Sequence, residues 1–194
     1  MNQPVKILAF AGSSRIASFN KKLVQIAAEG AKTAGAEVTY IDFLDYPMPL
    51  FNEDLEAKEG LPDSVLQFKA LLKSHQGLLI ACPEYNGSIT PLLKNAIDWA
   101  SRPEPGESPM ALSCYRGKVA ALLATSPGGL GGMRGLVHVR AILEGIGVIV
   151  IPDQKAIPNA YQAFDEQGNL TDEKQVQGVY AIAQKLADVT AKLS

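Results

Sequence analysis

The sequence has only two cysteines among its 194 residues, Cys82 and Cys114, and they stand far apart. This spacing argues against a disulfide framework, and it offers no Cys-x-x-Cys pair for a zinc or redox site. Histidine is equally scarce, since His75 and His138 are the only two. Because no Gly-x-Ser-x-Gly motif is present either, a hydrolase triad has little support.

The sequence also lacks an excess of charge of either sign and lacks a long apolar run. Lysine and arginine number 18 and aspartate and glutamate 20, giving a formal net charge of -2. The sequence therefore gives no sign of the basic surface that a nucleic-acid partner would need. No apolar run approaches the length of a membrane span, and the first residues lack the regions of a signal peptide. We expect a cytoplasmic protein with no membrane contact.

What the sequence does contain is an alternation of short apolar runs with segments of helical periodicity. Each apolar run is typical of a buried strand. The runs are residues 5–10, 37–41, 77–82, 118–124 and 148–151, the last stopped by Pro152. Helices are expected after each run, the last of them capped by Thr171.

This alternation predicts an α/β fold with a parallel sheet and helices on both faces. Two proline-containing stretches, residues 43–63 and 101–116, are expected to be irregular. If the strand order is 2-1-3-4-5, the first and third strands flank the switch point where open α/β sheets bind ligands. We expect one domain over residues 1–194, a three-layer sandwich around this five-stranded sheet.

The loop after the first strand offers hydroxyl and guanidinium groups at the start of a helix. Its polar residues are Ser13, Ser14, Arg15, Ser18 and Asn20. Free backbone N–H groups and the helix dipole favour an anion there, and these side chains would add charge-assisted hydrogen bonds to a phosphate. The alternative is that Ser18 only caps the helix while Arg15 lies in solvent. The loop is not a Walker motif.

The second loop follows the most apolar run and precedes a helix that Thr90 is expected to cap. It reads Pro83-Glu84-Tyr85-Asn86-Gly87-Ser88. Backbone N–H groups and the Asn86 side chain would suit a planar heterocycle, with Tyr85 against the ring or on a partner subunit. The alternative is that Pro83 and Gly87 merely shape the turn between strand and helix.

The third loop, residues 125–132, is rich in glycine, so its backbone can approach a ligand closely. Gly129-Leu130-Gly131 begins a Gly-x-Gly pattern, and Asp153 follows at the next strand's end. The third glycine position of a dinucleotide fingerprint holds Arg134 instead, so that fingerprint is weak. The three loops together are expected to form one site.

These motifs closely resemble the NADPH-dependent FMN reductase family, which includes bacterial chromate and quinone reductases. The matching segments are Gly12-Ser13-Ser14-Arg15 with Ser18 and Asn20, the stretch from Pro83 to Ser88 leading to Lys94-Asn95-Ala96-Ile97-Asp98-Trp99, and Ser126-Pro127-Gly128-Gly129 with Gly131-Gly132. The resemblance covers residues 5 to about 152 and implies a flavodoxin-like fold.

The resemblance also implies a cofactor and its ligands. Ser13, Arg15, Ser18 and Asn20 would hold the phosphate of FMN. Pro83, Glu84, Tyr85, Asn86 and Gly87 would contact the flavin ring and ribityl chain, and Ser126, Gly128 and Gly129 would close the site. The implied activity is an FMN-dependent NAD(P)H oxidoreductase that reduces a quinone or free flavin by a ping-pong mechanism.

Two other classes stay open at this point, a flavodoxin-like electron carrier and a non-catalytic nucleotide-binding module. The near-neutral charge and Arg15 argue against the carrier. A homodimer or homotetramer is also expected, partly from the resemblance. The helix after Pro91 is apolar nearly all round, so Trp99 is expected to need cover from a second subunit, or from the loop at residues 101–116.

Overall fold

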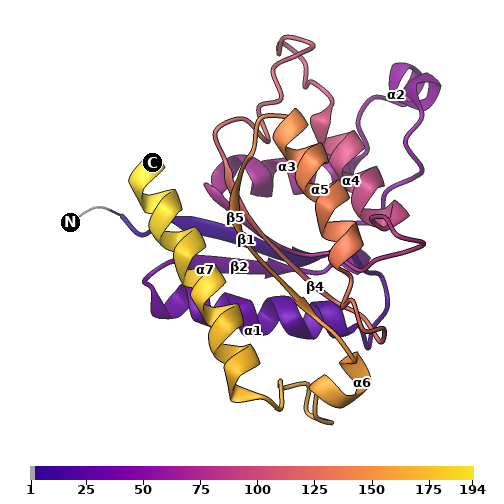
Figure 1. Ribbon diagram of the computed structural model, residues 1–194. Coiled ribbons are helices and arrows are strands. Elements are labelled where there is room, and N and C mark those ends of the chain that lie inside the picture. The colour runs from indigo at the N-terminus through magenta and orange to yellow at the C-terminus, as the bar shows by residue number, and fades with distance from the viewer. Residues whose placement is uncertain (1–2) are drawn as a thin grey trace.

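A computed structural model describes residues 3–194 of the protein, and a five-stranded parallel sheet forms its centre (Figure 1). The strand order is β2-β1-β3-β4-β5, which confirms the predicted topology. The strands are β1 (Lys6–Ala11), β2 (Glu37–Ile41), β3 (Gly77–Ala81), β4 (Val119–Thr125) and β5 (Ile149–Ile157).

Seven α-helices and one 3-10 helix connect these strands within residues 3–194. They are α1 (Phe19–Thr33), the 3-10 helix η1 (Phe43–Asp45), α2 (Glu53–Glu59), α3 (Asp63–Ser74), α4 (Pro91–Ser101), α5 (Met133–Gly145), α6 (Ala160–Ala163) and α7 (Glu173–Leu193). Figure 1 shows α1 and α7 on one face of the sheet and α3, α4 and α5 on the other.

The alternation of side chains along β1 divides the core between the two faces. Ile7 and Ala9 pack in the cluster formed with α1 and α7, whereas Leu8 and Phe10 pack in the cluster beneath α3, α4 and α5. Every residue of β3 and β4 is buried. A parallel strand covered on both faces must be apolar throughout, which explains why these strands are continuous apolar runs.

The predicted end of the fifth strand at Pro152 is wrong, because β5 continues to Ile157. β5 lies at the edge of the sheet, and its pairing with β4 shifts register between Ala120 and Leu122. Proline is tolerated at edges and irregularities of this kind, since no neighbouring strand needs its missing N–H group. The edge position could not be read from the local sequence.

Two smaller predictions also fail, and one short helix was missed. Residues 43–63 were expected to be irregular but contain η1 and the short helix α2, which Asn52 caps by accepting hydrogen bonds from Asp54 and Leu55. The short helix α6 was not predicted. The last helix is capped by Asp172, whose carboxylate accepts from the backbone of Lys174, and not by Thr171.

Trp99 is covered within its own chain, so the argument for a subunit interface at this residue is wrong. Its side chain is 0% exposed, and its indole Nε1 donates to the carbonyl of Pro49 at 2.8 Å. The Phe51 ring packs edge-on against it, with 5.0 Å between ring centroids. The covering residues come from the stretch before α2, while Tyr115 from the second proline-containing stretch donates to the carbonyl of Ile97.

No helix within residues 3–194 is long and apolar enough to cross a membrane.

Replacing Trp99 by Phe is expected to lower the free energy of unfolding by about 1–3 kcal/mol, because a buried hydrogen bond and part of a filled volume are lost. Urea unfolding measures this change. Light scattering should give the same molar mass for both proteins. The control is Tyr161→Phe, whose ring is 68% exposed. A change of molar mass in the Trp99 variant would restore the interface argument.

Candidate functional site

Three loops meet at the carboxyl edge of β1, β3 and β4, where they surround a hollow of about 110 Å³. The predicted residues that line it are Ser13, Arg15, Ser18 and Asn20 from the first loop, Pro83, Glu84 and Tyr85 from the second, and Ser126 from the third. Asn86, Gly87, Gly128 and Gly129 lie in the same loops but outside its wall. The hollow is smaller than a typical ligand pocket of about 300–1,000 Å³, so a ligand of nucleotide size would extend beyond it along the loops.

The start of α1 has the polar groups that an anion needs. Ser18 occupies the N-cap position and is only 4% exposed, but its hydroxyl makes no capping hydrogen bond. Within residues 3–194, the backbone N–H groups of residues 19–21 find no acceptor, as expected for a first helical turn. The helix end therefore presents unused donors beside a small polar side chain, which suits a phosphate.

Arg15 is exposed next to this helix end, and its guanidinium forms neither a hydrogen bond nor an ion pair with any residue from 3 to 194. Ser13 is buried, and its hydroxyl accepts only a long hydrogen bond of 3.4 Å from the backbone of Arg15. Both side chains can therefore engage an added anion without breaking a strong existing contact. This arrangement fits the phosphate of a nucleotide.

Asn20 also makes a structural contact with the end of β4. Its Nδ2 donates to the carbonyl of Thr125 at 2.9 Å, and its Oδ1 accepts from the Thr125 N–H at 3.1 Å. Both ends of the buried amide are thus occupied by the end of β4. Asn20 therefore ties α1 to the start of the third loop.

Thr90 joins the first loop to the second, a link that the sequence did not reveal. As predicted, Thr90 caps α4, since its hydroxyl oxygen accepts from the backbone of Leu93. The same hydroxyl donates to the carbonyl of Gly12 at 2.7 Å. A Cβ atom on Gly12 would lie 2.9 Å from the Cβ of Leu93, so only glycine lets the two segments approach this closely.

The second loop folds back as a tight hairpin. Tyr85 and Ser88 exchange two backbone hydrogen bonds of 3.0 and 3.1 Å around Asn86 and Gly87. Both central residues have positive φ, 52° and 79°, as a two-residue turn of this kind requires. The N–H groups of Asn86 and Gly87 donate to no acceptor within residues 3–194, so they remain available to a ligand.

Glu84 points toward α5 and fixes the second loop to the start of that helix. Its carboxylate accepts from the backbone N–H groups of Arg134 at 3.1 Å and Gly135 at 3.4 Å, and from Arg134 Nε at 2.7 Å. Burial alone would raise the pKa of Glu84, but these hydrogen bonds and the Arg134 charge together lower it. The sequence separated these residues by the whole of α4 and β4, so only the fold could reveal the pair.

The third loop is held against the end of β5. Gly131 has a φ of 62°, and a Cβ atom there would lie 2.7 Å from the carbonyl carbon of Ile157. The backbone N–H groups of Gly128 and Gly129 donate to no acceptor within residues 3–194. Gly131 therefore lets the loop pack closely on β5, while the N–H groups of Gly128 and Gly129 remain available to a ligand.

Cys82 lies beside the site but is unsuited to chemistry. It is buried, its thiol donates to the carbonyl of Pro83, and burial raises its pKa to about 12. This agrees with the prediction of a small buried apolar residue at the strand end. Across residues 3–194, no group of three or more His, Cys, Asp or Glu side chains comes together in a way that could hold a metal ion.

The strand order is that of a flavodoxin-like α/β protein. The start of α1, which suits a phosphate, and the polar loops lie at the switch point where such proteins bind ligands. Residues 5–162 match the family described as NADPH-dependent FMN reductase. Among curated relatives, the chain is 37% identical over 197 residues to an NAD(P)H:quinone oxidoreductase from Solanum tuberosum, covering 98% of this chain and 96% of that protein.

A second relative is an NAD(P)H-dependent FMN reductase from Pseudomonas aeruginosa, 38% identical over 175 residues, which cover 90% of this chain and 89% of the relative. Among solved structures, the flavoenzyme NAD(P)H:(acceptor) oxidoreductase FerB from Paracoccus denitrificans superimposes with a TM-score of 0.81 at 28% identity, covering 97% and 98% of the two chains. This protein belongs to the NADPH-dependent FMN reductase family, and it is an NAD(P)H-dependent oxidoreductase of the FMN reductase and quinone reductase type.

Replacing Asn20 by Ala should lower the free energy of unfolding by about 1–3 kcal/mol, because the buried N–H and carbonyl of Thr125 both lose their partner. Ser18→Ala is the matched control, since the Ser18 hydroxyl makes no capping hydrogen bond. It should change the stability by less than about 0.5 kcal/mol. Urea unfolding of protein freed of nucleotide makes the comparison, and equal losses would contradict it.

Glu84→Gln should destabilise the protein at pH 7 by about 1–2 kcal/mol, since the hydrogen bonds of a charged acceptor are weakened. The native pKa of Glu84 is lowered, so its carboxylate stabilises the fold above the ordinary Glu pKa of about 4.3, and that contribution is lost as the pH falls through the native value. The difference between variant and wild type should therefore shrink toward acid pH.

Unfolding experiments at several pH values measure this difference, with Glu166→Gln as a control at an exposed acid. A difference that stays constant from pH 7 into the acid range would show that the Glu84 charge does not contribute.

Proposed function

We propose that this protein binds one FMN per chain and uses it to carry reducing equivalents from NAD(P)H to a quinone, a free flavin or a similar small acceptor. The observation that supports this most directly is the start of α1, where Ser18 makes no capping bond and Arg15 has no partner within residues 3–194. Both groups suit the phosphate that distinguishes FMN from riboflavin. The names of the quinone reductase and FMN reductase relatives support the class of acceptor.

The residues of each loop would have separate roles in this function. When bound, FMN supplies the group that accepts a hydride from the nicotinamide and returns the electrons to the acceptor. Ser13, Arg15 and Ser18 would hold the phosphate. The free N–H groups of Asn86, Gly87, Gly128 and Gly129 would bind oxygen and nitrogen atoms of the heterocycle, where fixed donors stabilise developing negative charge.

No acid or base side chain is required for the hydride transfer itself. Glu84, the acidic side chain of the hollow, is held by Arg134 and Gly135. Its role in this proposal is to keep the second loop docked on α5. Asn20 at the start of α1 and Thr90 at the start of α4 act in the same way, so they position the binding groups and do not touch the reacting atoms.

We further propose that residues 1–194 form a single FMN-binding domain and that the protein is a cytoplasmic homodimer or homotetramer. Support for an assembly comes from the third loop and α5, not from Trp99. Leu130, Met133 and Val137 are 53%, 50% and 59% exposed and follow one another at helical or near-helical spacing. Exposed apolar side chains grouped beside a binding site often mark an interface.

The proposal is tested by identifying the flavin and by removing the phosphate-binding charge. Chromatography of the cofactor released from purified protein should show FMN. Arg15→Ala should weaken FMN binding roughly tenfold to a hundredfold, the effect of losing a hydrogen bond to a charged group worth about 1.5–3 kcal/mol. Riboflavin lacks the phosphate, so its affinity should hardly change.

The control for this experiment is Lys185→Ala, which removes an exposed charge on α7. Finding FAD, or finding no flavin after FMN is added, would overturn the proposal. Equal losses for FMN and riboflavin would show that Arg15 does not bind the phosphate.

Steady-state rates with NAD(P)H and a quinone should follow a ping-pong pattern, because a single hollow has to admit both substrates in turn. Double-reciprocal plots at several fixed quinone concentrations are expected to be parallel. Intersecting lines would mean that both substrates bind together. A protein without NAD(P)H turnover would instead be an electron carrier or a non-catalytic binding module.

A further inference from the structure

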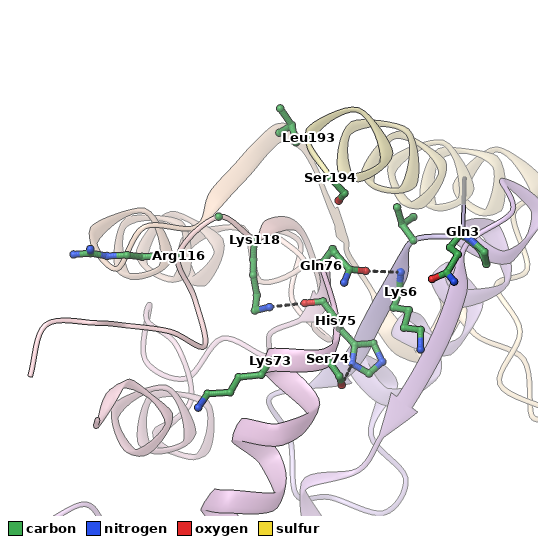
Figure 2. Close-up of a pocket in the computed structure, with 13 residues that line it drawn as sticks. Gln3, Lys6, Lys73, Ser74, His75, Gln76, Arg116, Lys118, Leu193 and Ser194 are labelled. Carbon is green, nitrogen blue, oxygen red and sulfur yellow. Dashed lines mark hydrogen bonds between the residues drawn. The ribbon is translucent and has the colours of Figure 1, made fainter. Parts of the chain in front are cut away.

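A larger cavity lies at the opposite edge of the sheet from the three loops. Its volume is about 690 Å³, and Figure 2 shows the residues that line it. Four segments contribute: residues 3–6 before and at the start of β1, 73–76 between α3 and β3, 116–118 before β4, and 193–194 at the end of α7. Nothing in the proposed function uses this cavity.

The side-chain charges that line this cavity are unbalanced. Its basic lining residues are Lys6, Lys73, Arg116 and Lys118, whereas no Asp or Glu side chain of the described chain lines it. Two of these charges are compensated from outside the cavity. Lys6 lies 3.8 Å from Glu37, and Lys73 lies 2.7 Å from Glu104 and 3.0 Å from Glu107. Arg116 and Lys118 form no ion pair within residues 3–194.

Lys118 is the most unusual of these residues because it is buried. Lys118 is 7% exposed, and its ammonium donates to the backbone carbonyl of His75. An ammonium has three donors, so that single bond leaves two without an acceptor among residues 3–194. Burying a charge without a counter-ion is unfavourable, and burial accordingly lowers the pKa of Lys118.

Gln76 supplies a second donor on the neighbouring strand start. Its Oε1 accepts from the backbone N–H of Lys6 at 3.0 Å, which fixes the orientation of the amide. Its Nε2 group makes no hydrogen bond to any residue from 3 to 194. Gly77 and Val119 are paired in the sheet, so Gln76 and Lys118, one residue before each, stand side by side. Figure 2 shows both side chains within the ring of lining residues, with Arg116 projecting outward at the rim.

His75 does not contribute a charge to this arrangement. Its two ring nitrogens lie 2.7 Å from the carbonyl of Leu71 and 2.8 Å from the hydroxyl of Thr39, so both are engaged. Burial, followed by the nearby charges of Lys118 and Lys6, lowers its pKa. The groups left for a ligand are therefore the Lys118 ammonium and the Gln76 amide, with the Arg116 guanidinium at the entrance.

We propose that this cavity binds a small molecule bearing an oxyanion, either a carboxylate or a phosphate group. The anionic oxygens would accept from Lys118 and Gln76, and they would supply the counter-ion that Lys118 lacks. Hydrogen bonds between an ionised donor and an ionised acceptor are the stronger kind, so one anionic group suffices for recognition. The competing explanation is structural: Lys118 would only satisfy a backbone carbonyl just beyond the end of α3.

The test is a titration of the full-length protein, labelled with nitrogen-15, followed by NMR. Inorganic phosphate and succinate are the two probes, and sodium chloride keeps the ionic strength constant. Saturable shifts are expected at the backbone amides of Gln76, Gly117 and Lys118. The probe that binds more tightly identifies whether the site prefers a phosphate or a carboxylate, and either preference supports the proposal.

Three variants separate the ligand site from a structural lysine. Lys118→Met should weaken binding roughly tenfold to a hundredfold. Lys118→Arg keeps the charge and should retain most of the affinity. If the Met variant does not fold, the affinity of the Arg variant is compared with that of the wild type instead. Lys174→Met, an exposed charge at the far end of α7, should leave the affinity unchanged.

Phosphate can also bind at the start of α1, so the titration is repeated in the Arg15→Ala variant, where the shifts at residues 76 and 117–118 should persist. Shifts confined to residues 12–20, or none that saturate, would overturn the proposal. So would unchanged binding in Lys118→Met. Loss of stability in that variant without saturable binding in the wild type would assign Lys118 the structural role.

Discussion

The pair of hydrogen bonds between Asn20 and the backbone of Thr125 is the contact on which the candidate site depends. β1 and β3 end in buried alanines, and the Thr125 hydroxyl at the end of β4 donates to the carbonyl of Ile157 in β5. The link from β4 to α1 therefore uses the backbone of Thr125. One amide on α1 satisfies both backbone groups at the end of β4. It thereby sets the distance between the start of α1 and the third loop, the two parts that a nucleotide would have to span.

Much of the fold could be predicted because the local pattern and the global fold agree. The run that became β3 is apolar throughout and those of β1 and β4 are polar only near their ends, as burial on both faces requires, and crossover rules then limit the strand order. The predictions failed where tertiary context decides. Pro152 breaks a strand in the middle of a sheet but not at an edge, and Trp99 looks unprotected until the distant Pro49 and Phe51 are placed against it.

The candidate site shows the same division. The residue types at the start of α1 predicted an anion site, because serine and arginine at a helix end carry that chemistry locally. The roles of Asn20 and Glu84 could not be predicted in this way. Asn20 binds the end of β4 and Glu84 binds the start of α5, both distant in sequence. Their side chains are of types that bind ligands, but the contacts they make here hold elements of the fold together. A sequence motif therefore shows which residues belong to a site more readily than it shows which of them bind the ligand and which hold the loops together.

Pro152 has a consequence for how copies of this protein can associate. An edge strand with free N–H and C=O groups is a template on which a strand of another molecule can add. At Pro152 that row of donors is interrupted, and the backbone of β5 is irregular at the same place. Continuation of the sheet from one molecule into the next is therefore disfavoured at this edge. Growth into an open-ended, fibre-like array by repeated addition of molecules at β5 is disfavoured for the same reason.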